Sequence, residues 1–154
     1  MGELELPSEL TDLIAAGTWP LTQAEANRQN VSAGPIPGEL VERLVPGESQ
    51  LFLLPPPFRT IAERCGGGER DGCERNFWQE YGALDQIDAE RAVVIGDFGF
   101  GSDAVIVLDY RQAPSPSLIR LAWTDGALRP SWVPFFATFS EFARAFQLHE
   151  RRWR

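Results

Sequence analysis

The chain contains no lysine, so each of its 14 strongly basic residues is an arginine. A GxxxxGK[ST] phosphate-binding loop, a protein kinase, a pyridoxal Schiff base and a lysine nucleophile all need a lysine side chain. These four kinds of site are therefore excluded. Histidine is nearly as scarce, because His149 is the only one. One histidine leaves little material for Ser-His-Asp or Cys-His catalysis or for a multi-histidine metal site, which disfavours most hydrolases and metalloenzymes.

Long hydrophobic runs are also missing. No apolar stretch approaches the roughly 20 residues of a membrane helix, and the opening MGELELPSEL is acidic where a secretion signal is basic and then apolar. We therefore expect a cytoplasmic protein without membrane contacts. The only cysteines, Cys65 and Cys73, flank the stretch GGGERDG. They could close a small disulfide loop, but free thiols are commoner in a reducing cytosol, and a zinc ion would need further ligands.

What the chain has in excess is negative charge. Its 154 residues suffice for one domain, and 44% hydrophobic with 23% charged residues is a globular composition. Acidic residues number 22, which gives a formal net charge of −8. This charge disfavours binding to a nucleic-acid backbone and favours a basic protein partner. The oligomeric state stays open, with a monomer as the default expectation.

The first part of the domain, about residues 1–48, is expected to be helical. A helix over 6–17 presents one apolar face and ends at a glycine. Thr22 and Glu25 form a capping box for a second short helix that continues to about residue 29. Prolines and glycines on either side leave room for one or two helical turns over 39–44.

Residues 49–136 are expected to form the sheet. Short aliphatic or β-branched runs separated by Gly, Pro, Ser and Asp predict antiparallel strands over 51–54, 92–95, 104–109, 118–123 and 132–136. Trp123 and Trp132 flank an Asp-Gly turn, so we expect them to face each other across a hairpin and to pack in the core.

A last helix over 138–148 is predicted by a capping box at Thr138 and Glu141 and by an apolar stripe of Phe139, Phe142, Phe146 and Leu148. The charged tail after it, residues 150–154, is expected to be a frayed, solvated end, with a small contact patch as the alternative. Helices at both ends therefore cover a central sheet, which is an α+β arrangement.

The most unusual string is IGDFGFGSD at 95–103. It cannot be a kinase Asp-Phe-Gly loop, because the lysine and the HRD stretch are missing. It also cannot be a dinucleotide fingerprint, since a strand rather than a helix follows it. A tight hairpin is favoured, in which Gly96, Gly99 and Gly101 allow positive φ or close backbone approach, and Ser and Asp side chains bond local amides.

The carboxylates Asp97, Asp103 and Asp109 could alternatively lie close enough to share a proton or hold a cation. For Asp109 a structural pairing with a neighbouring arginine such as Arg111 competes with this role. The glycine-rich loop over 65–73 is expected to be mobile and is a candidate source of specificity.

Three segments in the second half carry a family resemblance. The run IGDFGFGSDAVIVLDYR at 95–111, a strand that ends in Trp123, and FATFSEFARAF at 136–146 together resemble the SMI1/KNR4 family, also called the SUKH superfamily. LPSELTDLIAAGTWP at 6–20 and LLPPPF at 53–58 resemble a bacterial branch of that family. The resemblance covers most of the chain in order.

The resemblance implies a single α+β domain in which helices at the N- and C-termini flank a central, curved, mostly antiparallel sheet. Many members carry an acidic residue and a histidine after the strand-final tryptophan, whereas Thr124, Asp125 and Gly126 follow Trp123 here, so no role that needs this histidine is carried over. The positions that match the family pattern, most of them implied to define the fold, are Gly96, Gly99, Gly101, Ser102, Asp103, Leu108, Asp109, Trp123, Phe139 and Phe142.

The resemblance also implies a role without catalysis. Many bacterial members look like immunity proteins that bind and neutralise secreted toxin domains, often nucleases or deaminases. We therefore expect a protein that needs no cofactor or metal and binds a basic toxin domain. An intracellular regulatory or scaffold protein is the alternative, and an enzyme that uses the aspartates named above is a third hypothesis. The candidate partner contacts are Asp97, Asp103, Glu69, Asp71 and Glu74.

Overall fold

The computed structural model describes residues 4–27, 36–66, 80–98, 104–112, 114–123 and 129–153. Much of the glycine-rich stretch lies outside these ranges, so the expected mobility of that loop and the expectation that Cys65 and Cys73 are free thiols stay predictions. The same holds for the exact end of the second helix. The candidate residues that fall outside the described ranges are Glu69, Asp71, Glu74, Gly99, Gly101, Ser102 and Asp103.

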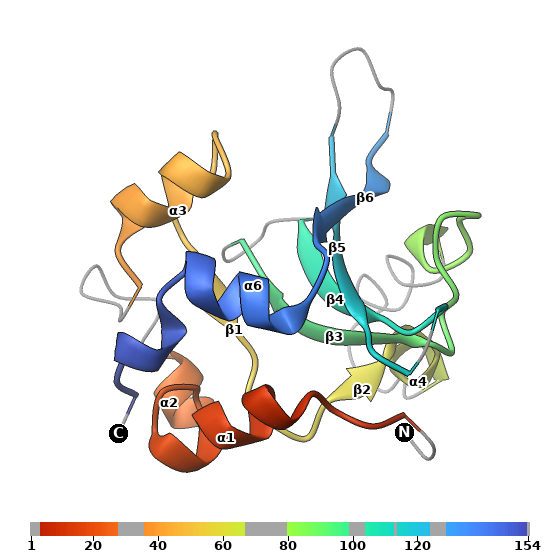
Figure 1. Ribbon diagram of the computed structural model, residues 1–154. Helices are drawn as coiled ribbons and strands as arrows, with labels where there is room; N and C mark the ends of the chain where they lie inside the picture. Colours follow the sequence, from red (N-terminus) through yellow and green to blue (C-terminus); the bar gives the residue numbers. More distant parts are fainter. Residues whose placement is uncertain are drawn as a thin grey trace.

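The core of the fold is a six-stranded sheet in the order β1-β3-β4-β5-β6, with β2 also paired to β3. All of these pairs are antiparallel. Figure 1 shows the sheet curving, with helices from both ends of the chain packed around it, which confirms the predicted single α+β domain. The strands are β1 Phe52–Leu53, β2 Arg59–Thr60, β3 Ala92–Asp97, β4 Val105–Asp109, β5 Ser117–Ala122 and β6 Ser131–Phe136.

Helices α2 and α6 begin at the two capping signals that the sequence analysis identified. The Glu25 N–H donates to Thr22 Oγ1 at 3.1 Å, and the Glu141 N–H donates to Thr138 Oγ1 at 3.1 Å. Both predicted capping boxes are therefore confirmed. The helices are α1 Ser8–Ala16, α2 Gln23–Asn27, α3 Gly38–Leu44, α4 Ile61–Gly66, α6 Phe139–Ala145 and a short 3-10 turn, η2 Leu148–Glu150. No helix within the described ranges has the length and apolar character needed to cross a membrane.

Helix α4 is an element that the sequence analysis missed. Its signal was present, since the Glu63 N–H donates to Thr60 Oγ1 at 3.1 Å and the Thr60 N–H donates to Glu63 Oε1 at 2.8 Å. This is a third capping box, with the same Thr-x-x-Glu spacing as the two that were recognised.

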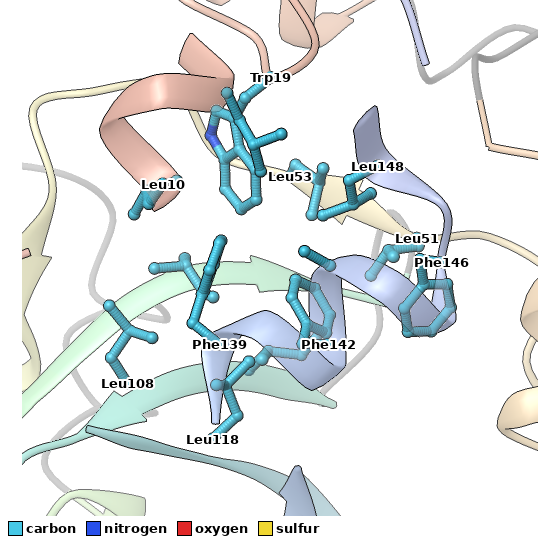
Figure 2. Close-up of a cluster of buried hydrophobic side chains, with 14 of the residues drawn as sticks. Leu10, Trp19, Leu51, Leu53, Leu108, Leu118, Phe139, Phe142, Phe146 and Leu148 are labelled. Carbon is cyan, nitrogen blue, oxygen red and sulfur yellow. The ribbon is translucent and has the colours of Figure 1, made fainter. Parts of the chain in front are cut away.

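Both faces of the sheet are buried. The first core lies between the sheet and helices α1, α3 and α6, as Figure 2 shows around Phe139, Phe142 and Phe146. The second core lies on the opposite face under α4 and the chain segment before β3. Because successive strand residues point to opposite faces, β3 and β4 are apolar along almost their whole length. The second core consists of Ile61, Ile87, Ala92, Val94, Val105, Val107, Ile119, Leu121 and Trp132.

An irregularity in β6 gives the first core much of its aromatic character. Leu118 pairs with Phe136 and Ile119 pairs with Pro134, so Phe135 is an extra residue in the ladder. Both Phe135 and Phe136 pack against the first core, with their ring centroids 4.5 Å apart.

The C-terminal tail is not frayed, and that prediction is wrong. Trp153 is only 1% exposed, and its backbone N–H donates to the carbonyl of Gly17 at 2.8 Å. Nη1 of Arg152 donates to the carbonyl of Ala16 at 3.3 Å. The last carbonyls of a helix need donors from outside that helix, and the tail supplies them to α1.

The expected contact between two tryptophans is also wrong. Trp132 lies opposite Leu121, is buried in the second core, and donates its indole N–H to the carbonyl of Tyr81 at 2.8 Å. Trp123 follows the end of β5 and is 59% exposed. Trp123 therefore lies one residue beyond the last pair of the ladder, Ala122 with Ser131, and packs in neither core.

Candidate partner-binding surface

Of the acidic residues predicted to contact a partner, Asp97 is the one that lies within the described ranges. It is the last residue of β3, lies opposite Phe52 and Val105, and is half-buried. Phe98 follows it and donates its N–H to the carbonyl of Ala104 at 3.1 Å, which closes the connection toward β4. We call the end of the sheet that carries Asp97, Phe98 and Trp123 the hairpin end.

The structure separates two of the three aspartates whose clustering was the alternative to a structural hairpin. Asp109 pairs with Ala92 at the start of β3, whereas Asp97 is at its other end. At about 3.3 Å per residue, the two lie roughly 16 Å apart along the strand. A shared proton or cation between Asp97 and Asp109 is therefore excluded, and this part of the cluster hypothesis is wrong.

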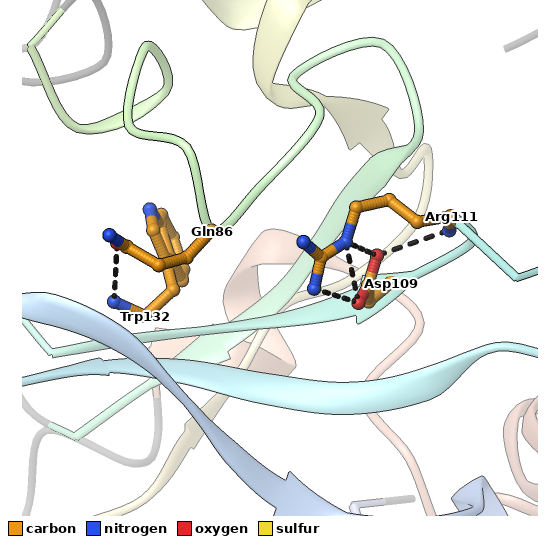
Figure 3. A network of polar contacts seen from close by, with 4 residues as sticks. All are labelled: Gln86, Asp109, Arg111 and Trp132. Atoms are coloured by element: carbon orange, nitrogen blue, oxygen red, sulfur yellow. Dashed lines mark hydrogen bonds and ion pairs between the residues drawn. The ribbon is translucent and has the colours of Figure 1, made fainter.

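Asp109 instead forms the arginine pair that was its alternative role. Nε of Arg111 donates to Oδ1 and Oδ2 at 3.0 and 3.1 Å, and Nη2 donates to Oδ2 at 2.8 Å, as Figure 3 shows. The Arg111 backbone N–H also donates to Oδ1 at 3.1 Å. The hydrogen bonds that Arg111 donates to Asp109 raise the pKa of Arg111. Asp109 is buried and Arg111 is exposed, so the arginine covers the carboxylate at the turn after β4.

An open cleft of about 460 Å³ lies beside this pair. Its polar lining comes from Arg111, Ser115 and Ser117, and Ile119 and Pro134 add apolar surface. Because the main arginine of the cleft is already neutralised by Asp109, the cleft does not present an isolated positive charge.

The histidine joins a different polar cluster on the surface. Glu9 accepts from the Ser140 hydroxyl at 2.5 Å and from His149 Nε2 at 2.8 Å, which links α1, α6 and η2. Partial burial raises the pKa of Glu9, but hydrogen bonds from Ser140 and His149 and the charges of His149 and Arg144 outweigh it and lower the pKa. Both donors bind the carboxylate, so His149 does not act on the serine oxygen as a base does in a triad.

Metal-ligating side chains do not gather elsewhere in the described ranges, where no group of three or more His, Cys, Asp or Glu residues could hold an ion. The glycine motif has a structural role at the one position described. A Cβ on Gly96 would lie 2.6 Å from the Phe52 carbonyl oxygen, so the expected close backbone approach is confirmed. Leu108, Phe139 and Phe142 are buried in the first core, as fold-defining positions should be.

Arg120 is a residue that the sequence analysis missed. It lies on β5 opposite Ile106, near the hairpin end, and is half-buried. Its guanidinium carbon is 5.8 Å from the ring centre of Phe98 and 5.6 Å from that of Phe135. A lone arginine in a β-strand pattern gives no sequence signal for such a position.

Glu48 is the charged side chain that influences Arg120 from the segment before β1. Burial lowers the pKa of Arg120, and the charge of Glu48 opposes this change. Burial likewise raises the pKa of Glu48, and the charge of Arg120 opposes it. No hydrogen bond or ion pair joins these two described residues, so the attraction acts over a longer distance.

The edge of the sheet at β6 is protected against pairing with another strand. The Trp132 N–H donates to Gln86 Oε1 at 3.4 Å, which Figure 3 shows, and the Ala137 N–H donates to Glu141 Oε2 at 3.2 Å. Pro134 has no N–H to offer between them. A partner is therefore expected to bind through side chains and not by strand addition at β6.

The comparisons with known proteins assign no function to this surface. No family model, curated protein or solved structure matches the chain. What the structure defines is the class of fold, a single α+β domain with both faces of an antiparallel sheet covered.

Proposed function

We propose that this chain is a non-catalytic, cytoplasmic protein-binding domain of the SMI1/KNR4 type that binds and neutralises a basic toxin domain. The observation that carries the proposal is Trp123, a tryptophan that is 59% exposed at the hairpin end. Figure 1 shows the end of β5, which leads into Trp123, extending away from the body of the domain. No metal or cofactor is needed for this role.

Tryptophan is well suited to anchor such a contact. Binding energy at protein interfaces is concentrated in a few residues, and tryptophan, tyrosine and arginine are the commonest of them. An exposed indole is costly in water, so burying it against a partner is favourable. The half-buried Asp97 lies at the same end of the sheet, and its negative charge favours a cationic partner there.

The net charge of −8 supplies the second support for this function. A nuclease must present a cationic surface to phosphates, and an acidic inhibitor is attracted to that surface over several ångströms. Glu80, Asp85 and Glu90 are exposed on the segment before β3 and contribute to this field. Salt should therefore slow association, because it screens charges that lie outside the interface.

The test is affinity capture with the tagged chain from its source cells, with elution in steps of increasing salt and identification by mass spectrometry. We expect one basic protein to elute at moderate salt and to lose its nuclease or deaminase activity when the purified chain is added. Trp123→Ala should weaken its binding about tenfold or more. Leu21→Ala is the matched control, because Leu21 is a large exposed hydrophobic residue at 44% but lies next to α2.

Two results would contradict the proposal. Recovery of only neutral housekeeping or envelope proteins would support the regulatory or scaffold alternative. Equal binding of the Trp123→Ala and Leu21→Ala variants to the basic partner would show that the hairpin end is not the interface.

A further inference from the structure

Arg120 is held in place by contacts that leave its hydrogen-bond donors unused by the part of the chain that the structure describes. The guanidinium lies within 6 Å of the Phe98 and Phe135 ring centres, at 5.8 and 5.6 Å, which is the range of a cation–π contact. The two rings are themselves packed edge to face, with centroids 5.8 Å apart. Neither ring can accept a conventional hydrogen bond from the five guanidinium N–H groups.

Three other arginines in the described ranges donate to acceptors of the chain. Arg111 is bonded to Asp109, Arg151 to the Phe146 carbonyl and to Gln147, and Arg152 to the Ala16 carbonyl. Arg120 is half-buried, yet within these ranges it makes no hydrogen bond and no ion pair. No Arg120 nitrogen is both buried and unsatisfied, so its N–H groups are open to water and can be reached by a ligand that supplies a paired acceptor.

We propose that Arg120 is the anchor for a carboxylate on the partner protein, either an Asp or Glu side chain or a chain terminus. This inference rests on the proposed protein-binding function. It assigns one local acidic group to a partner that is basic overall. The planar guanidinium presents parallel N–H groups that match the two oxygens of a carboxylate.

The surroundings favour a carboxylate over a phosphate. Phe98 and Phe135 give the site apolar flanks, so a singly charged planar group loses less hydration there than a dianion does. The charge of Glu48 already acts on Arg120, and the whole chain carries −8, so additional negative charge on the ligand is opposed. The partner's carboxylate replaces the weak, distant attraction of Glu48 with direct hydrogen bonds.

The first test needs no partner. Sodium chloride is replaced stepwise by sodium acetate at constant ionic strength while the arginine Nε–Hε signals are followed by NMR. We expect a saturable shift of the Arg120 signal and no comparable shift of Arg59, which is exposed and has no aromatic clamp. Equal, linear shifts of both arginines would overturn the proposal, because they would show general weak anion association.

The second test uses the captured basic protein. Arg120→Gln should weaken its binding about tenfold or more, and Arg120→Lys should do nearly the same, since lysine keeps the charge but loses the paired donors. Arg59→Gln should bind like wild type. Circular dichroism checks that each variant is folded. If folded Arg120→Gln binds the basic protein as wild type does, the inference about Arg120 is overturned and toxin binding is not. If no toxin partner is found, the proposed function is overturned and the acetate result is not affected.

Discussion

A substitution at Trp153 tests whether the C-terminal tail packs against the end of α1. Its side chain is 1% exposed, although it lies in the tail for which the sequence predicts a solvated end. An aromatic side chain buries about 150–250 Å², and at about 25 cal/mol per Å² this corresponds to roughly 4–6 kcal/mol. Residual burial in the unfolded chain lowers that figure by roughly 10–40%. We therefore expect Trp153→Ala to reduce the free energy of unfolding by about 3–5 kcal/mol, in the range of measured core aromatic deletions.

The assay is urea unfolding followed by far-ultraviolet circular dichroism, which does not depend on the fluorescence of the deleted indole. Trp123→Ala is the matched control, because the same substitution is made at a ring that is 59% exposed. It should change the free energy of unfolding by no more than about 0.5–1 kcal/mol. Equal effects of the two substitutions would refute the docking of the tail on α1 and restore the picture of a frayed end.

Three further predictions concern the sheet, the surface cluster and the partner. Gly96→Ala places a Cβ 2.6 Å from the Phe52 carbonyl oxygen, so it should destabilise the domain by about 1–3 kcal/mol, and wild-type stability in urea would contradict the β1–β3 contact. The pKa of Glu9 is lowered in the folded state from its usual value of 4.5. The Glu9 carboxylate therefore stabilises the fold fully at a pH above 4.5, and this contribution is lost as the pH falls through the folded pKa. Glu9→Gln should therefore be less stable by roughly 0.2–1 kcal/mol at pH 7 and should converge with wild type in acid, whereas a constant difference would contradict the assignment. Partner association should slow as salt rises, and a salt-independent rate in stopped-flow mixing would remove the electrostatic argument.

Most of the fold could be predicted from local signals in the sequence. Thr22 with Glu25 and Thr138 with Glu141 mark helix starts because the side chains satisfy free backbone donors, a requirement that is independent of tertiary structure. The aliphatic runs of β3 and β4 marked strands for the same local reason. The third capping box, at Thr60 and Glu63, has the same spacing, but the sequence analysis missed it because it lies next to the glycine-rich stretch.

The errors came from interactions between distant residues. Trp153 is buried because it meets the end of α1, and nothing near residue 153 indicates that contact. Trp123 is exposed because the ladder ends at Ala122 and Ser131, and sequence spacing around a turn does not determine where a ladder ends. Asp97 and Asp109 are close in the sequence, but they occupy opposite ends of the antiparallel pair of β3 and β4.

The candidate site was the least predictable part. Acidic residues near the β3–β4 connection were recognised from composition and motif, but Arg120 was not, because its significance depends on two phenylalanines from β6 and the end of β3. An extra residue in β6 places Phe135 on the same side as Phe136 and so beside this arginine. Such an arrangement is visible only once the strands are paired.

The most direct test of toxin neutralisation is an activity titration. The basic protein recovered by capture is held at a fixed concentration, and its nuclease or deaminase activity is measured as the purified chain is added. We predict a linear loss of activity that ends at one chain per toxin domain, with Trp123→Ala needing a large excess to reach the same loss. Undiminished activity in a complex that demonstrably forms would contradict the central claim that this chain neutralises the partner it binds.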